Sequence, residues 1–289
     1  SDTFGLANIA AFDKHKVMYY TREGFDFFYP GYGSSYPSVM GAIGMLVEQG
    51  GHSRGGRAVK TDDGYTLTLR QRIFDHYQTS FATLSAAVRN RQTLNQYFHD
   101  SFQEKTNKGN AAAYIFPDNT HNYLYDVMNM LMAHGIEIHQ EKTDFNVIKA
   151  HNYKDGIANR HEFKKGDFVI FTDQPRHLFI NTVLQREMEI EDSIMYDMAT
   201  WSAPLAYNLE AYWTENKLRM GTTRLIEKLN YPSGLTKKNA PYAYVINWHQ
   251  RNAPKALAML WNKGYRVRSA RKEFNNGIRD YPRGTLVIL

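Results

Sequence analysis

An internal repeat constrains the fold of this chain more than any other feature of its sequence. Residues 112–145 align with residues 242–274 with one gap. Each copy begins with a short apolar run, at 113–116 and at 243–246, and continues into a segment with helical periodicity. Self-similarity of this kind indicates two copies of one supersecondary unit. We therefore expect a buried strand followed by a helix, twice.

The helix in each copy has a clear apolar face and a clear end. The face in the first copy recurs at helical spacing, at Leu124, Val127, Met128, Leu131 and Met132. In the second copy, Asn252 is suited to the N-cap and Pro254 to the first turn, and Leu257, Leu260 and Trp261 supply the stripe. Gly135 and Gly264 match as the left-handed residues that end the two helices.

A second strand is expected after each glycine, at 136–139 and 265–267, and each unit closes with a turn and a strand, at 161–171 and 279–289. Strand, helix and strand with a right-handed crossover form the unit of a parallel sheet covered by helices. We therefore predict that residues 110–289 form an α/β domain with an open parallel sheet, similar to flavodoxin. A further helix is expected near 177–185.

The first hundred residues differ in kind. Glycine and tyrosine crowd residues 24–56, and a helical pattern then runs from 68 to 107 with a break near Arg91. Its apolar stripe is typical of a core-facing helix and consists of Ile73, Tyr77, Phe81, Leu84 and Val88. The domain boundary falls at 107–110, so the expected domains are residues 1–107 and 110–289.

Composition excludes several classes of protein. The 35 Lys and Arg residues outnumber the 29 Asp and Glu residues, but no basic run supports nucleic-acid binding. No stretch approaches the roughly 18 apolar residues of a transmembrane helix. The chain has no cysteine, so it has no disulfide, thiolate metal site or cysteine nucleophile.

The histidines do not form a convincing metal site in the sequence. His134, Glu137 and His139 have a spacing that can place ligands near one ion. The repeat, however, assigns the intervening Gly135 to a helix end and the residues after it to a strand. His161 and His177 are single histidines in turns. We therefore predict no metal site built from this chain alone.

Glu48 is the candidate catalytic residue. It ends the small, apolar segment Gly41–Val47, which favours a buried strand. A carboxylate at the end of such a strand is costly unless it has a partner or a chemical task, and burial would raise its pKa toward the range of a general base. The alternative is an ion pair with Arg54 or Arg57.

The motif Tyr-Pro-Gly-Tyr-Gly-Ser-Ser-Tyr-Pro at 29–37, followed by Gly-Ala-Ile-Gly-Met-Leu-Val-Glu-Gln at 41–49, resembles the C-terminal part of the zinc carboxypeptidase catalytic domain. The likeness is to bacterial carboxypeptidase A-like proteins that carry an extra C-terminal domain. It implies that Glu48 is the general base for a zinc-bound water and that Tyr29 closes over the substrate's C-terminal residue. Tyr32 is a nearly equal match for Tyr29. Without the resemblance, both tyrosines would be ordinary loop packing.

The resemblance covers residues 1–107 and implies a peptide substrate, zinc as cofactor and a periplasmic or secreted protein. The family's zinc ligands and its substrate-carboxylate arginine lie upstream and have no match here. The chain opens directly in helix-like sequence, and its last residues form a strand pattern with nothing after it. We therefore expect a fragment that depends on an upstream zinc-binding part and is inactive alone.

Residues 110–289 resemble the appended domain of the same bacterial proteins, which is similar to the class I glutamine amidotransferase fold. Tyr196–Trp213 carries much of this likeness. Amidotransferase activity needs a cysteine nucleophile, which this chain lacks. The resemblance therefore implies a scaffold or a binding module in this part of the chain.

The alternative to the carboxypeptidase interpretation is a non-enzymatic α/β protein that binds a ligand or a partner. Ligands of open parallel sheets bind at the carboxyl ends of the strands. The loops Pro117–His121 and Asn247–Asn252 occupy equivalent places in the repeat and would line such a crevice.

Overall fold

The computed structural model describes residues 2–21, 29–49, 56–103, 109–119, 121–188, 202–218, 223–232 and 239–289. The chain divides into two compact units. The first consists of residues 1–110 and 172–202, and the second of residues 111–171 and 203–289. The expected boundary at 107–110 coincides with the end of the first segment, while residues 172–202 group with the first unit.

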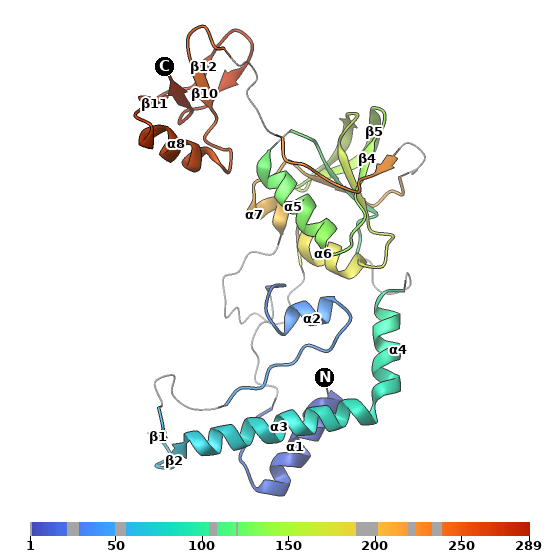
Figure 1. The fold of residues 1–289 in the computed structure, drawn as a ribbon. Coiled ribbons are helices and arrows are strands. Elements are labelled where there is room, and N and C mark those ends of the chain that lie inside the picture. Colours follow the sequence, from blue (N-terminus) through green and yellow to red (C-terminus); the bar gives the residue numbers. More distant parts are fainter. Residues whose placement is uncertain are drawn as a thin grey trace. The chain divides into compact units, whose positions relative to one another are not determined.

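Helices dominate the first unit, where α1 lies beside the long α3 (Figure 1). The Thr68 side chain caps α3 by accepting a hydrogen bond from the Gln71 amide at 3.2 Å. The predicted break near Arg91 is confirmed, because α3 ends at Arg89 and α4 begins at Arg91. No helix in the described ranges could span a membrane. The elements are α1 (Asp2–His15), α2 (Ser35–Val39), β1 (Ala58–Lys60), β2 (Thr66–Thr68), α3 (Leu69–Arg89), α4 (Arg91–Ser101) and α6 (His177–Leu184).

The contact between α1 and α3 combines polar and aromatic side chains, and the rings of His15 and Phe74 meet edge to face with centroids 5.2 Å apart. Thr83 donates a hydrogen bond to the buried Asn8 at 3.3 Å, and Asp75 and Ala86 are also buried. The apolar stripe of α3 is on the open side instead, with exposed fractions of 53% to 65% for Ile73, Tyr77, Phe81, Leu84 and Val88. The expectation that this stripe faces a core is therefore wrong within the described residues, because they supply no surface to cover it.

The second unit contains a seven-stranded sheet and a separate three-stranded sheet. The larger sheet has the order β6-β5-β8-β3-β7-β4-β9, and the smaller has the order β10-β14-β11. A hairpin of β12 and β13 completes the strands. The elements are β3 (Ala113–Phe116), α5 (Asn122–Ala133), β4 (His139–Glu141), β5 (Phe145–Asn152), β6 (Ala158–Phe163), β7 (Phe168–Phe171), α7 (Ala203–Ala206), β8 (Tyr212–Thr214), β9 (Thr223–Leu225), β10 (Tyr244–Ile246), α8 (Ala253–Asn262), β11 (Val267–Ser269), β12 (Phe274–Asn275), β13 (Asp280–Tyr281) and β14 (Leu286–Ile288).

The predicted α/β class agrees with this architecture, but the open parallel, flavodoxin-like sheet is not supported. β3 and β4 run parallel to each other, as the β-α-β pattern requires, but β7 lies between them and pairs antiparallel with both. Every pairing within the described sheets is antiparallel. The closing strand β7 lies between β3 and β4, the two strands that α5 connects. Because β7 pairs with both of them, β3 and β4 do not form the parallel pair that was expected.

The two repeats share not only their elements but also their strand register. Ile115 pairs with Val169 in the first sheet, and the aligned Val245 pairs with Val287 in the second. On the other side of the closing strand, Gln140 pairs with Phe168 as Ser269 pairs with Leu286. A hairpin precedes the closing strand in both copies. The repeat in the sequence is therefore a repeat in the fold.

The glycines that were predicted to end the two helices have the expected backbone conformation. Gly135 has a φ of 73° and Gly264 a φ of 78°. Nothing lies within 4 Å of a side chain built at either position. The backbone conformation alone therefore favours glycine there.

The two repeats differ in how deeply their strands and helices are buried. β3 and β7 are buried along their whole length, and Leu124, Met128 and Leu131 of α5 are fully buried. β10 is only half-buried, and Trp261 of α8 is 60% exposed. The core of the second unit is therefore centred on the first repeat.

Candidate functional site

The tyrosine-glycine motif of the first unit forms a tight loop that leads into α2. The rings of Tyr29 and Tyr32 meet edge to face with centroids 5.4 Å apart, and the Tyr32 amide donates a hydrogen bond to the Tyr29 carbonyl at 3.2 Å. A Cβ at Gly31 would lie 2.5 Å from the Tyr29 ring, so the pair packs closely only because residue 31 has no side chain. The structure thus brings together the two tyrosines predicted to bind substrate.

A second close contact joins Ser34, Ser38 and Gly44, in the segment that precedes Glu48. Ser38 donates a hydrogen bond to the Ser34 carbonyl and accepts one from the Gly44 amide, both at 3.1 Å. A Cβ at Gly44 would lie 1.7 Å from the Ser34 carbonyl oxygen. This contact holds residues 34–44 in one compact turn.

Glu48 lies exposed in a segment that is neither helix nor strand. The expected buried strand at 41–48 is therefore wrong for the described structure, because a buried strand needs neighbouring strands and this unit offers only the β1–β2 hairpin. No hydrogen bond or ion pair joins Glu48 to Tyr29, Tyr32 or Arg57 in the described part of the chain. Arg54, the other expected partner, lies outside the described residues.

Candidate metal ligands do not converge among the residues that the structure describes, where no three His, Asp or Glu side chains are grouped for an ion. His139 lies on β4, 3.9 Å from Glu137, and burial lowers its pKa. His134 bonds to the Met130 carbonyl at 2.8 Å. The residues described do not make a zinc site, so no chemical step is assigned to zinc within them.

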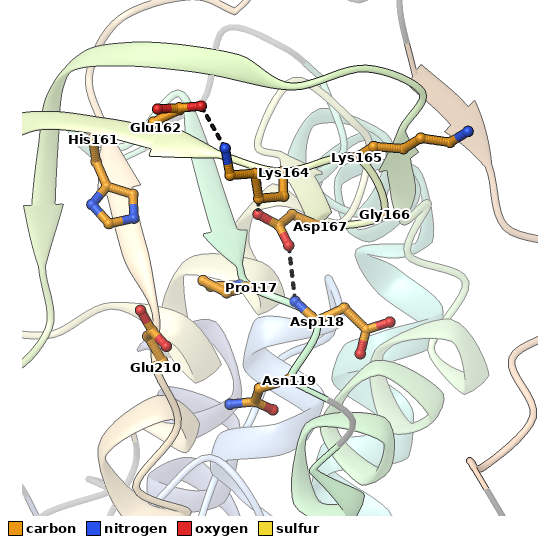
Figure 2. A pocket seen from close by; sticks show the side chains of 10 residues that line it. All are labelled: Pro117, Asp118, Asn119, His161, Glu162, Lys164, Lys165, Gly166, Asp167 and Glu210. Atoms are coloured by element: carbon orange, nitrogen blue, oxygen red, sulfur yellow. Dashed lines mark hydrogen bonds and ion pairs between the residues drawn. The ribbon is translucent and has the colours of Figure 1, made fainter. Parts of the chain in front are cut away.

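A polar cavity of about 380 Å³ opens in the second unit, where β3 ends beside the turn between β6 and β7 (Figure 2). The side chains of His161, Asn119 and Glu210 border it, and Lys165 extends away from them. The lining comprises Pro117, Asp118, Asn119, His161, Glu162, Lys164, Lys165, Gly166, Asp167 and Glu210. Carboxylates outnumber amines in this set.

Asp167 organises one wall of the cavity from a nearly buried position, with an exposed fraction of 6%. Its carboxylate accepts hydrogen bonds from the Asp118 amide at 3.0 Å and the Lys164 amide at 2.7 Å. These two bonds tie the loop after β3 to the β6–β7 turn. The role of Asp167 is therefore to shape the cavity, because its oxygens are already engaged.

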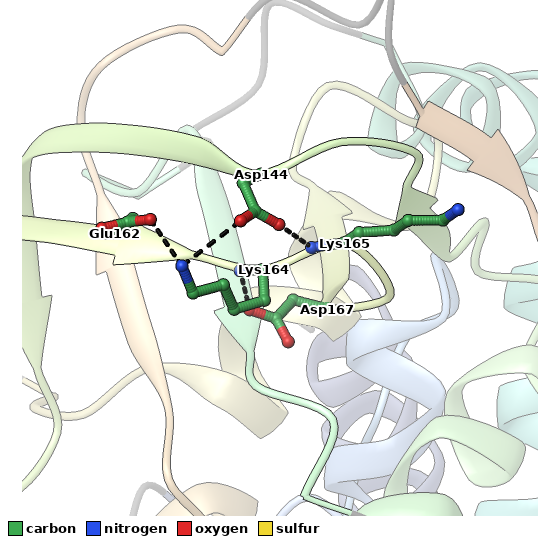
Figure 3. A network of polar contacts seen from close by, with 5 residues as sticks. All are labelled: Asp144, Glu162, Lys164, Lys165 and Asp167. Carbon is green, nitrogen blue, oxygen red and sulfur yellow. Dashed lines mark hydrogen bonds and ion pairs between the residues drawn. The ribbon is translucent and has the colours of Figure 1, made fainter.

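A network of charges holds the same turn on its outer side (Figure 3). The Lys164 ammonium contacts Glu162 at 2.5 Å and Asp144 at 3.3 Å, and these carboxylates raise its pKa. Asp144 accepts a hydrogen bond from the Lys165 amide at 2.8 Å, which with Lys164 lowers the Asp144 pKa. The Lys164 ammonium thus forms ion pairs with two carboxylates.

The cavity carboxylates of Asp118 and Glu210 each accept a hydrogen bond from a tyrosine. Tyr125 donates to Asp118 at 3.0 Å, and Tyr212 donates to Glu210 at 3.1 Å. Burial, followed by the neighbouring carboxylate, raises the pKa of each tyrosine to about 12. His161 stacks on the Tyr212 ring with centroids 4.3 Å apart. The cavity therefore presents hydrogen-bonded carboxylates beside an aromatic stack.

The sequence predicted part of this cavity. Pro117, Asp118 and Asn119 belong to one of the two loops expected to line a crevice, whereas the residues of the other, Asn247–Asn252, do not line it. Sequence reasoning missed Asp167 and Glu210. The turn before the closing strand is repeated, as Lys164-Lys165-Gly166-Asp167 in one copy and Pro282-Arg283-Gly284-Thr285 in the other. This repetition is the signal in the sequence that marks the turn containing Asp167.

Much of the predicted amidotransferase-like segment lies outside the described residues, which resume at Ser202. Its end forms α7 and β8. Comparison of the chain with known protein families, curated proteins and solved structures gives no match.

Proposed function

We propose that the first unit is the C-terminal part of a metallocarboxypeptidase-like catalytic domain, whose metal-binding part lies on polypeptide outside this chain. Glu48 is the general base and accepts a proton from the attacking water, while Tyr29 or Tyr32 contacts the C-terminal residue of the peptide. The motif at 29–37 and 41–49 supports this assignment. In this proposal residues 1–289 are inactive alone.

The observation that carries the proposal is the open apolar face of α3. Soluble proteins rarely leave large contiguous apolar patches uncovered. Here five large apolar side chains at helical spacing are each more than half exposed, while Thr83 and Phe74 of the same helix contact Asn8 and His15 of α1. Such an arrangement is expected of a helix that belongs to a larger domain. In this proposal, the same larger domain would also supply the neighbouring strands that a strand at 41–48 requires.

The test compares the natural polypeptide, including any sequence before Ser1, with residues 1–289. Release of C-terminal amino acids from peptides and the zinc content are measured for both. The proposal expects hydrolysis and bound zinc only for the longer polypeptide. Hydrolysis or stoichiometric zinc in residues 1–289, or neither in the natural polypeptide, would contradict it.

The cavity of the second unit favours a second candidate function, the binding of a small polar ligand. Its carboxylates outnumber its amines and Lys164 is engaged in ion pairs, so it suits a ligand that carries an amine or guanidinium. In the second repeat Trp248 stands where the first has Asp118, so the cavity is a feature of the first copy.

Thermal-shift measurements with arginine, and with glutamate as the control of opposite charge, test this candidate. Arginine is expected to raise the unfolding temperature, and Glu210→Gln is expected to weaken the effect while Glu227→Gln, at an exposed position, leaves it unchanged. No shift with arginine, or an equal shift in both variants, would rule out this ligand class at the cavity.

A further inference from the structure

The turn that leads from helix to strand has the same backbone in the two repeats but different side chains. The Gly135 amide donates a hydrogen bond to the Met132 carbonyl after α5, and the Gly264 amide donates one to the Trp261 carbonyl after α8, both at 2.9 Å. Both glycines have the left-handed φ that ends a helix. The turn itself therefore places the same demand on the chain in both copies and does not explain why their side chains differ.

The side chains at this turn are more deeply buried in the first repeat than in the second. Ile136 is 3% exposed, whereas the aligned Tyr265 is 52% exposed. Met132 is half-buried, whereas the aligned Trp261 is 60% exposed. The second repeat thus presents two large aromatic rings where the first repeat has smaller, covered side chains.

A third exposed aromatic side chain lies at the same end of the small sheet. Tyr244 of β10 and Val267 of β11 both pair with Ile288 of β14, so β10 and β11 begin at one end of the sheet. Tyr242 comes two residues before Tyr244, as Tyr265 comes two residues before Val267, and Tyr242 is 83% exposed. We call this surface the aromatic end, and it consists of Tyr242, Met259, Trp261, Lys263, Tyr265 and Arg266.

The charge of the second repeat differs from that of the first in the same way. Residues 239–289 contain nine Lys and Arg against two Asp and Glu, whereas residues 112–171 contain six against eight. All nine basic side chains of the second repeat are exposed. At the aromatic end, Lys263 and Arg266 stand where the first repeat has His134 and Glu137. No ion pair joins Lys263 or Arg266 to a carboxylate within the described part of the chain. The surface therefore suits an anionic partner.

The combination of side chains favours one kind of anionic partner. Trp and Tyr are enriched where a membrane meets water, and anionic lipids attract Lys and Arg at that level. Met259, in the last turn of α8, is 54% exposed beside these groups. A nucleic acid offers stacking to aromatic rings but no apolar phase for a methionine, whereas the boundary of a bilayer offers both.

We propose that the aromatic end binds the surface of a bilayer that contains anionic phospholipids. Trp261, Tyr265 and Met259 enter the headgroup boundary, and Lys263 and Arg266 pair with lipid phosphates. Binding of this kind is peripheral and needs no helix that crosses the membrane.

Cosedimentation of residues 1–289 with vesicles of phosphatidylcholine alone, and with vesicles that also contain phosphatidylglycerol, tests the proposal. Binding is expected only to the anionic vesicles. Lys263→Gln combined with Arg266→Gln should weaken it by about 25-fold, because each cation near an anionic leaflet contributes a gain of about 5-fold. Lys142→Gln combined with Lys149→Gln is the matched control, since it removes the same charge from exposed positions of the first repeat.

Tryptophan fluorescence tests whether the ring of Trp261 enters the lipid boundary. Anionic vesicles should shift the emission to shorter wavelength, and Trp261→Phe should remove most of this shift. Trp248→Phe is the control, because Trp248 is also exposed but follows β10 at the opposite end of the small sheet. Thermal unfolding of each variant without lipid shows that it is folded.

Three results would overturn the inference. One is the absence of binding to the anionic vesicles. Another is an equal loss of binding in the two double variants, which would mean that net charge alone attracts the chain. The third is tighter binding to single-stranded DNA than to the vesicles, weakened by the changes at Lys263 and Arg266, which would identify a nucleic acid as the partner. None of these results depends on Glu48 or on carboxypeptidase activity, so this inference and the proposed function fail separately.

Discussion

Gly44 sits where the loop before Glu48 makes its closest internal approach. A methyl group at this position would overlap the Ser34 carbonyl oxygen, at 1.7 Å. Gly44→Ala is expected to lower the free energy of unfolding of the first unit by about 1–3 kcal/mol, the usual cost of overpacking. Gly33→Ala is the matched control, because nothing lies within 4 Å of its Cβ position. Urea denaturation of both variants measures the difference, and equal stability would contradict the packing described.

Gly135 and Gly264 end their helices in the left-handed conformation, and each has free space around its Cβ position. Alanine at either site is expected to destabilise the second unit by about 1 kcal/mol, for backbone reasons alone. Gly5→Ala is the control, because Gly5 lies inside α1 and alanine is the better helix former there. Thermal unfolding measures the change in stability, which is expected to be a loss for Gly135→Ala and Gly264→Ala and a gain for Gly5→Ala. A gain in stability for Gly135→Ala would show that this residue does not need glycine.

At the scale of elements, the exposed apolar face of α3 leads to a prediction about stability and self-association. Leu84 and Val88 are 64% and 65% exposed, so replacing both with lysine should change the stability of residues 1–289 by less than about 0.5 kcal/mol. The same double variant should reduce self-association, which sedimentation velocity measures. Ala86→Lys, at a buried position of the same helix, is the control expected to unfold the chain. A large loss of stability in the double variant would mean that this face is already packed.

The elements themselves were largely predictable from the sequence, but their arrangement was not. Helical periodicity located α3, α5, α6 and α8, because an amphipathic helix repeats its apolar residues locally. β8 and β9 were missed, because three-residue strands carry almost no periodic signal. The position of β7 between β3 and β4 depends on long-range pairing that no local pattern specifies.

The site was predictable to a similar extent. Tyr29 and Tyr32 were singled out by their motif, and the structure places their rings in contact. The strand expected before Glu48 does not form, because the described residues of the first unit contain no sheet that it pairs with. The cavity combines residues from β3, the β6–β7 turn and the stretch before β8, which lie far apart in the sequence.

At the scale of the whole molecule, the two units share one property. Each has large apolar side chains that the described residues leave exposed, such as Leu84 and Val88 of α3 in the first unit and Trp261 of α8 in the second. Apolar burial is the main favourable term in folding, so such faces reduce the stability of the chain in isolation.

The proposed role of Glu48 is tested by the rate at which the natural polypeptide releases C-terminal amino acids, with Glu48 intact and with Glu48→Gln. Glu227→Gln, an exposed carboxylate of the second unit, is the matched control. Loss of a general base predicts a decrease of about 100- to 10,000-fold for Glu48→Gln, with unchanged thermal unfolding, and no decrease for Glu227→Gln. Equal rates for Glu48→Gln and the unaltered protein would contradict the account.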